Sequence, residues 1–115
     1  MVEPRSQARS AHGGAAAEGI RLVKVIQSPK PGKKLRAIFR RDNGREFVRD
    51  FGAAGMDDYT RTHDKDQRER YRERHKKDLA TGDPTRAGFL SMEILWGPST
   101  SVQENIRAYR LRHGL

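Results

Sequence analysis

The stretch KLRAIFRRDNGREFVRDFG, residues 34–52, contains two strand-like runs on either side of Asp42-Asn43-Gly44. Asn-Gly or Asp-Gly between alternating apolar residues is the strongest short-range signal of a β-hairpin. In a three-residue loop with the glycine in the left-handed conformation, Arg41 lies opposite Arg45. The stretch therefore predicts two antiparallel strands, over residues 34–41 and 45–51.

The three-residue loop also explains where the charged residues of the hairpin lie. It places Arg40 opposite Glu46, and on the same face it places Arg36 opposite Asp50. A two-residue Asn-Gly loop would shift the register by one residue and break both ion pairs. The hairpin is therefore expected to have one exposed face with arginines and one apolar face that joins a core. The apolar face carries Leu35, Phe39, Phe47 and Phe51.

Residues outside the hairpin predict one more strand and three helices. Branched side chains over residues 20–26 predict a strand. Asp83-Pro84 is typical of a helix start and Gly97-Pro98 of a stop, so they bound an apolar helix over residues 84–96. The other elements are two polar helices, over residues 64–79 and 101–112.

These elements predict an α+β fold. The three strands form an antiparallel meander, and the apolar helix packs on its aromatic face. At roughly 1.5–3 kcal/mol per fully buried large side chain, this cluster is expected to dominate the stability. We expect residues 19–115 to form one small domain and residues 1–18 a flexible arm. The apolar helix contributes Phe89, Leu95 and Trp96 to the cluster.

The helix expected over residues 64–79 is rich in charges of both signs. Asp64 can cap it, with Gln67 completing a variant of the capping box. Five oppositely charged pairs lie four residues apart, and each contributes about 0.2–0.5 kcal/mol. Because these charges largely satisfy one another, we expect a solvated, electrically balanced helix rather than one that follows a phosphate backbone. The pairs are Asp64 with Arg68, Lys65 with Glu69, Asp66 with Arg70, Glu73 with Lys77, and Arg74 with Asp78.

Positive charge is concentrated in the first half of the chain. The net charge is +9, and residues 19–56 carry ten basic and three acidic residues, a net of +7. Such an excess favours an acidic partner, either nucleic acid or an acidic protein surface. A solvated face of a basic protein is the alternative interpretation. The candidate polyanion-binding residues are Lys30, Lys33, Lys34, Arg36, Arg40, Arg41 and Arg45.

The helices expected over residues 84–96 and 101–112 are joined by a short turn that contains Gly97. This spacing is shared by helix-turn-helix DNA-binding proteins and by ordinary helical hairpins. A sequence-reading regulator is therefore the alternative hypothesis for the function. Its reading helix would present Gln103, Asn105, Arg107 and Arg110.

Signals of catalysis and metal binding are weak. The chain has no cysteine, and its four histidines lack the spacing of a zinc site. Asp57 and Asp58 could join other carboxylates around a magnesium ion, as in a small nuclease. Adjacent aspartates before a helix are, however, usually capping residues. We expect no enzyme activity, metal, cofactor or small-molecule substrate, and a metal-dependent nuclease is the weakest hypothesis.

Membrane and secretion signals are also weak. No run approaches the roughly 18 apolar residues that span a bilayer. The opening MVEPRSQARSAHGGAAAEG lacks the apolar centre of a secretory signal. The sequence therefore predicts a protein that is neither transmembrane nor secreted and that has no membrane partner.

Several short motifs occur together within about residues 33–112. They are Phe51-Gly52, Asp58-Tyr59-Thr60, His63-Asp64, Tyr71, Arg74-His75, Pro84, Gly88-Phe89, Ser91, Leu95-Trp96 and Pro98. In combination they resemble a family of small basic proteins of unknown function encoded by large DNA viruses of algae and amoebae. The family brings no activity, cofactor or catalytic residue that can be carried over. The resemblance implies a virus-like product that belongs to a particle or assembly.

The function expected from the sequence is a non-enzymatic structural or accessory protein of a large assembly. The resemblance implies that it is associated with a virion, or located in the cytoplasm or nucleus of a host. Its basic hairpin and its arm would contact nucleic acid or an acidic protein surface.

Overall fold

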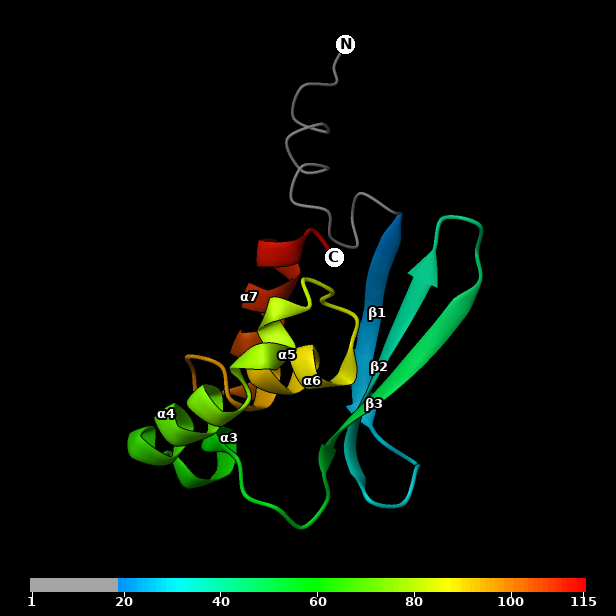
Figure 1. The fold of residues 1–115 in the computed structure, drawn as a ribbon. Coiled ribbons are helices and arrows are strands. Elements are labelled where there is room, and N and C mark those ends of the chain that lie inside the picture. The colour runs from blue at the N-terminus through cyan, green and yellow to red at the C-terminus, as the bar shows by residue number, and fades with distance from the viewer. Residues whose placement is uncertain (1–18) are drawn as a thin grey trace, which may run out of the picture.

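A computed structural model describes residues 19–115, and the arm expected over residues 1–18 lies outside them. The described chain begins with an antiparallel three-stranded meander and continues with helices (Figure 1), which confirms the predicted α+β fold. The sheet has the order β1-β2-β3. Its strands are β1 (Ile20–Gln27), β2 (Lys33–Arg41) and β3 (Glu46–Ala53).

The β2–β3 hairpin has the register expected from its sequence. Gly44 is left-handed with φ of 89°, and the Arg41 amide donates to the Arg45 carbonyl at 2.8 Å across the three-residue loop. Cross-strand pairs place charged residues on one face and aromatic residues on the other, as predicted. The pairs include Arg40 with Glu46, Arg36 with Asp50, Phe39 with Phe47, and Leu35 with Phe51.

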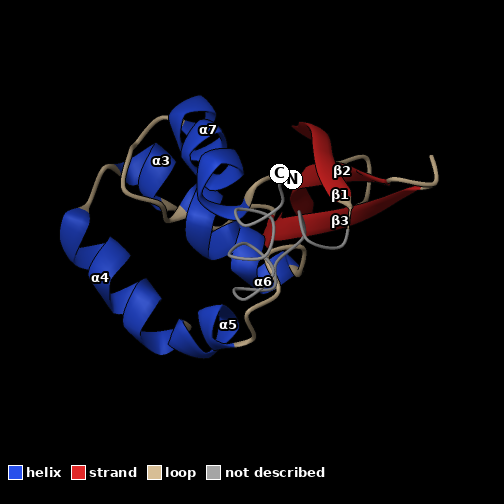
Figure 2. Cartoon of the chain, turned by 90° about the horizontal axis from the view of Figure 1, so that it is seen from above, coloured by secondary structure: helices blue, strands red, loops and turns tan. Residues whose placement is uncertain are grey.

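Strand β1 pairs along the other edge of β2. A bulge at Val23 shifts the register between Leu22 and Lys24, and the Val23 carbonyl accepts a hydrogen bond from Arg110 at 3.1 Å. The helices lie against one face of the sheet, and no described helix covers the opposite face (Figures 1 and 2).

The core forms where the aromatic face of the sheet meets the apolar helix, as expected. Phe39 and Phe51 are fully buried, and Leu95 and Trp96 are at most 5% exposed. Leu35, Phe47 and other partly buried apolar residues pack around them. The residues predicted to dominate stability therefore lie in one cluster.

The apolar helix is shorter and less regular than predicted. It was expected over residues 84–96, whereas α6 (Ala87–Leu90) begins at Ala87 and continues as a π-helix, η1 (Ser91–Leu95). The Asp83 carboxylate accepts hydrogen bonds from the amide and hydroxyl of Thr85. Asp83 therefore closes a turn rather than capping the helix, which moves the start to Ala87.

The charged helix is interrupted, contrary to the prediction of one helix over residues 64–79. A short helix, α3 (Tyr59–Thr62), precedes α4 (Lys65–Arg74), and α5 (Lys76–Ala80) follows after a break at His75. Beyond the break, Asp78 lies close against Gly88 of α6, where a β-carbon would come within 2.6 Å of its carboxylate. Packing of α5 on α6 therefore redirects the chain.

The expected i, i+4 ion pairs of α4 do not form. Within residues 19–115, Glu73 pairs instead with Lys76 at 2.7 Å. Arg68 turns inward and donates to the carbonyls of Trp96 and Gly97 at 3.1 and 2.8 Å. The carbonyls at the end of a helix lack intrahelical donors, and α4 supplies these donors at the end of η1.

The last helix agrees with the prediction. Helix α7 (Val102–His113) is capped by Ser101, whose hydroxyl accepts from the Glu104 amide at 3.2 Å. The Ser99 hydroxyl also donates to the Glu104 carboxylate at 2.7 Å. These contacts fix the turn between η1 and α7.

Candidate nucleic-acid interface

The end of the β2–β3 hairpin projects beyond the helices (Figures 1 and 2). Three exposed arginines, Arg41, Arg45 and Arg49, gather there, and we call them the tip arginines. The Cζ atoms of Arg41 and Arg49 lie 4.6 and 4.8 Å from the ring centroid of Phe47. This ring stacks in turn on the buried Phe39 at 5.1 Å. The core thus anchors an aromatic ring that positions two guanidinium groups.

The tip arginines keep their charge available. Within residues 19–115, none of them forms an ion pair with a carboxylate. A cation–π contact holds a guanidinium over a ring without neutralising it. The remaining N–H groups can therefore donate to the oxygens of an anion.

Two other arginines of the predicted set are compensated within the hairpin. Arg36 donates to both oxygens of Asp50 at 2.9 and 3.1 Å, and Arg40 donates to Glu46 at 3.1 and 2.7 Å. The hydrogen bond from Arg36, followed by that from Ser28, lowers the pKa of Asp50 to about 2. The same pairing that fixes the register therefore removes Arg36 and Arg40 from the free positive surface.

The predicted lysines lie away from the tip arginines. Lys34 is paired with the buried Asp58, which also caps α3 through the Thr60 amide at 2.9 Å. Lys30 and Lys33 are exposed near the β1–β2 turn, at the other end of the sheet. The seven predicted residues therefore do not form one continuous surface.

Sequence reasoning missed three exposed basic residues near the tip. Arg49 lies two residues from Phe47 on the same strand face, so the fixed register already places it beside the ring. Arg21 and Lys24 of β1 lie opposite Arg40 and Ile38 on the uncovered face of the sheet. Their position depends on the pairing and bulge of β1, which the sequence did not define.

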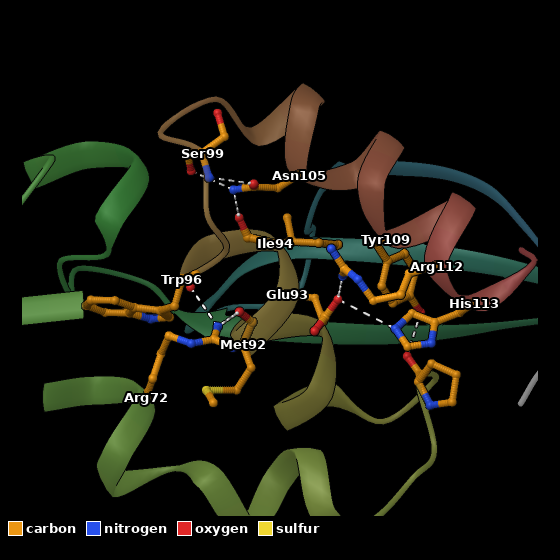
Figure 3. A network of polar contacts seen from close by, with 11 residues as sticks. Arg72, Met92, Glu93, Ile94, Trp96, Ser99, Asn105, Tyr109, Arg112 and His113 are labelled. Atoms are coloured by element: carbon orange, nitrogen blue, oxygen red, sulfur yellow. Dashed lines mark hydrogen bonds and ion pairs between the residues drawn. The ribbon is translucent and has the colours of Figure 1, made fainter. Parts of the chain in front are cut away.

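The predicted DNA-reading helix does not present its four residues together. Gln103 and Arg107 are exposed, but Asn105 is 1% exposed. Its side chain donates to the carbonyls of Ile94 and Ser99, both at 2.8 Å, and accepts from the Ser99 amide at 3.0 Å (Figure 3). Asn105 holds the turn between η1 and α7, and Arg110 is bound to the Val23 carbonyl.

The two candidate nuclease aspartates have structural contacts. The Asp58 carboxylate pairs with Lys34 and accepts a hydrogen bond from the Thr60 amide. An Asp57 carboxylate oxygen lies 4.0 Å from Nη1 of Arg61. Both line a hollow of roughly 510 Å³ between the β3–α3 loop and α4. Residues 19–115 contain no group of three or more histidine or acidic side chains that could hold a metal ion.

Helices in the described part of the chain are too short or too polar to cross a membrane. No curated protein and no solved structure matches the chain.

One protein-family model matches residues 23–75, which include most of the sheet and the helices α3 and α4. It begins in β1, earlier than the resemblance to residues 33–112 implied, and it ends at His75, before α6, η1 and α7. Its description agrees with the expectation of an uncharacterised family and states neither an activity nor a source. Residues 23–75 match the model of a family of unknown function, DUF5754.

Proposed function

We propose that this protein is a non-enzymatic accessory or structural component of a large nucleic-acid-containing assembly, such as a virion, and that it holds nucleic acid through the tip arginines. The observation that carries the proposal is the arrangement of Arg41 and Arg49 around Phe47. These exposed cations have no carboxylate partner within residues 19–115, whereas their neighbours Arg36 and Arg40 do.

The expected mode of binding is contact with phosphates rather than with base edges. A guanidinium presents planar N–H donors that match phosphate oxygens. Such contacts position a protein on nucleic acid without reading its sequence. Arg21 and Lys24 lie exposed on β1 near the same end of the sheet, but on the uncovered face, opposite to the face on which Arg41 and Arg49 contact Phe47. We therefore expect affinity that depends on salt and varies little with sequence.

Salt dependence tests this proposal directly. Each phosphate neutralised on duplex DNA contributes about 0.9 to the slope of log K against log salt. Binding of a labelled duplex would be measured by fluorescence anisotropy over a series of salt concentrations. Replacing all three tip arginines by glutamine (R41Q/R45Q/R49Q) should weaken binding and reduce the slope by about 3.

Two matched controls separate a local effect from a loss of overall charge. The variant K65Q/K77Q/R86Q removes the same charge from exposed positions on or beside the helices and should keep most of the slope. The variant R40Q/E46Q removes a compensated pair and should leave the slope unchanged. A slope that is the same in the tip variant and the wild type would refute phosphate binding by the hairpin.

The alternative partner, an acidic protein surface, is distinguished in native extract. The tagged protein would be recovered with and without nuclease digestion. Loss of the captured material after digestion supports nucleic acid as the partner. Proteins that stay bound after digestion, but are lost with R41Q/R45Q/R49Q, would instead show that the tip arginines contact protein.

A further inference from the structure

A second arginine pair lies on α4, away from the hairpin. Arg68 and Arg72 are one helical turn apart and both half-buried. The Arg68 Nε and the Arg72 Nη1 donate to the same carbonyl oxygen, that of Trp96, at 3.1 and 2.8 Å. Arg72 Nη1 also donates to the Met92 carbonyl at 2.7 Å (Figure 3). Sharing one oxygen places the two guanidinium groups side by side.

These contacts leave the positive charge of both groups uncompensated. Their hydrogen-bond acceptors are neutral carbonyls, and neither arginine forms an ion pair within residues 19–115. Glu93 lies nearby, but its carboxylate is paired with Arg112. Burial, and then the charge of Arg68, lower the pKa of Arg72. Because both guanidinium groups donate to the same carbonyl oxygen, a bound anion would offset the repulsion between two close like charges.

Both guanidinium groups retain free donors. The bonds to carbonyls use Nε of Arg68 and Nη1 of Arg72. Each guanidinium has five N–H groups in a planar fork, so both terminal nitrogens of Arg68, and Nε and Nη2 of Arg72, are left without a partner in the described chain. Arg68 is also held against the Tyr59 ring, with its Cζ 5.6 Å from the centroid. The donors are thus oriented before any ligand arrives.

A groove of roughly 820 Å³ opens beside this pair. Its lining holds five basic residues and two acidic ones, and one of the acidic residues, Glu73, is already paired with Lys76. The apolar residues Leu79 and Met92 form part of the wall. The excess of positive charge favours an anionic ligand. The basic residues are Arg68, Arg70, Arg72, Arg74 and Lys76.

We propose that the α4 groove binds a phosphate group between Arg68 and Arg72. The planar N–H donors of two arginines can each bond a different oxygen of a phosphate group. A monatomic anion offers only one acceptor and therefore matches this arrangement less well. The site goes beyond the proposed function of the hairpin, because α4 and the hairpin tip lie at opposite ends of the molecule (Figures 1 and 2). One chain would then hold phosphates at two separate places.

The arginine side-chain NMR signals of the wild-type protein test the site without a substitution. Inorganic phosphate would be compared with chloride at equal ionic strength and pH, and the Nε–H signals would be followed. The signals of Arg68 and Arg72 should shift and saturate with phosphate. Those of Arg36 and Arg40, which are held by carboxylates, serve as internal controls. Equal small shifts at all four arginines would overturn the proposal.

A substitution test uses the exposed residues of the groove, because exposed side chains usually contribute little to stability. R70Q/R74Q should weaken phosphate binding by roughly two- to fivefold, from the loss of two exposed charges. K65Q/K77Q removes the same charge outside the groove lining and should leave the dissociation constant unchanged. Equal weakening in both variants would show that phosphate responds only to net charge, which would refute the site.

The source of the phosphate is resolved in the variant R41Q/R45Q/R49Q, in which the hairpin no longer contributes. Shifts of Arg68 and Arg72 on addition of a short DNA duplex identify a nucleic-acid phosphate as the ligand. Shifts with inorganic phosphate alone identify a small phosphate ligand. Because this background lacks the tip arginines, failure of the groove and failure of the hairpin are separate results.

Discussion

The β2–β3 hairpin and helix α4 have similar alternating charges, but the fold uses these charges in different ways. In the hairpin, Arg36 and Arg40 pair with the carboxylates directly opposite them on the neighbouring strand. In α4, Arg68 and Arg72 form no ion pair with the acidic residues one turn away. They donate instead to backbone carbonyls in and just after η1. Arg36 and Arg40 are therefore compensated within the hairpin, whereas Arg68 and Arg72 make tertiary contacts.

The difference follows from geometry. Directly opposed residues in a sheet have Cβ atoms about 4.5–5.5 Å apart, and the register fixes that neighbour. A helical i, i+4 pair contributes only about 0.2–0.5 kcal/mol, whereas a hydrogen bond that involves a charged group contributes about 1.5–3 kcal/mol. An arginine within reach of unpaired carbonyls therefore turns toward them. The lesson is that cross-strand charge pairs can be predicted from sequence more safely than helical ones.

The largest effect is expected from Trp96→Ala, which removes the residue where α4 meets the core. Trp96 is 5% exposed, and its ring stacks on Tyr71 at 4.1 Å. Loss of a buried tryptophan costs about 3–5 kcal/mol, a large part of the total stability of a small domain. Chemical denaturation followed by circular dichroism measures the cost. Val48→Ala, on the uncovered sheet face, should stay within about 0.5 kcal/mol, and an equal midpoint for both variants would show that the core is misassigned.

Separate replacement of Arg72 and Arg74 by leucine tests whether the inward-facing arginines hold α4 against the rest of the fold. Arg72→Leu removes the donor to Met92 and Trp96 and should cost about 1.5–3 kcal/mol. Arg74 is exposed, so Arg74→Leu should change stability by no more than about 0.5 kcal/mol. Urea denaturation compares them, and hydrogen exchange of the α4 amides should accelerate only in the Arg72 variant. Equal costs would mean that α4 is not docked by its arginines.

The fold was predictable where local rules determine the neighbours. Asp42-Asn43-Gly44 defines the loop, the loop defines the register, and the register defines the pairs of Arg36 and Arg40. The cap of α7 at Ser101 is equally local. The break at His75 and the change to a π-helix at Ser91 depend on which segments pack together, and no short window of sequence contains that information.

The candidate interface was predictable only in part, for the same reason. Net charge located the basic segment, and the tip arginines Arg41 and Arg45 lie within it. Because the predicted register already placed Arg36 opposite Asp50, Arg36 should not have been included among the candidate polyanion-binding residues. The burial of Asn105 depends on the turn at Ser99, so helical periodicity alone could not reveal it.

Acid titration tests the hairpin side of the comparison through Asp50. Its pKa in the folded protein is about 2, against about 3.9 for an unperturbed aspartate. The pairing with Arg36 therefore stabilises the fold fully above about pH 4, and the contribution is lost as the pH falls toward 2. NMR titration of the Asp50 carboxyl group should show this low pKa, with an upward shift in Arg36→Gln. Arg49→Gln is the control, and an equal shift there would mean that general charge, not the pair, depresses the pKa.

The smallest effect is expected at the exposed pair of Arg40 and Glu46, whose side chains are 52% and 44% exposed. A double-mutant cycle with Arg40→Gln and Glu46→Gln should give a coupling energy of about 0.2–1 kcal/mol, because water screens exposed ion pairs. The coupling should shrink further in high salt. Thermal and urea denaturation of the four proteins supply the cycle. Zero coupling at low salt would mean that the turn and apolar pairs define the register without help from charge. A measurable coupling would show that Glu46 compensates Arg40 in solution, whereas the neighbouring Arg41 has no carboxylate partner within residues 19–115.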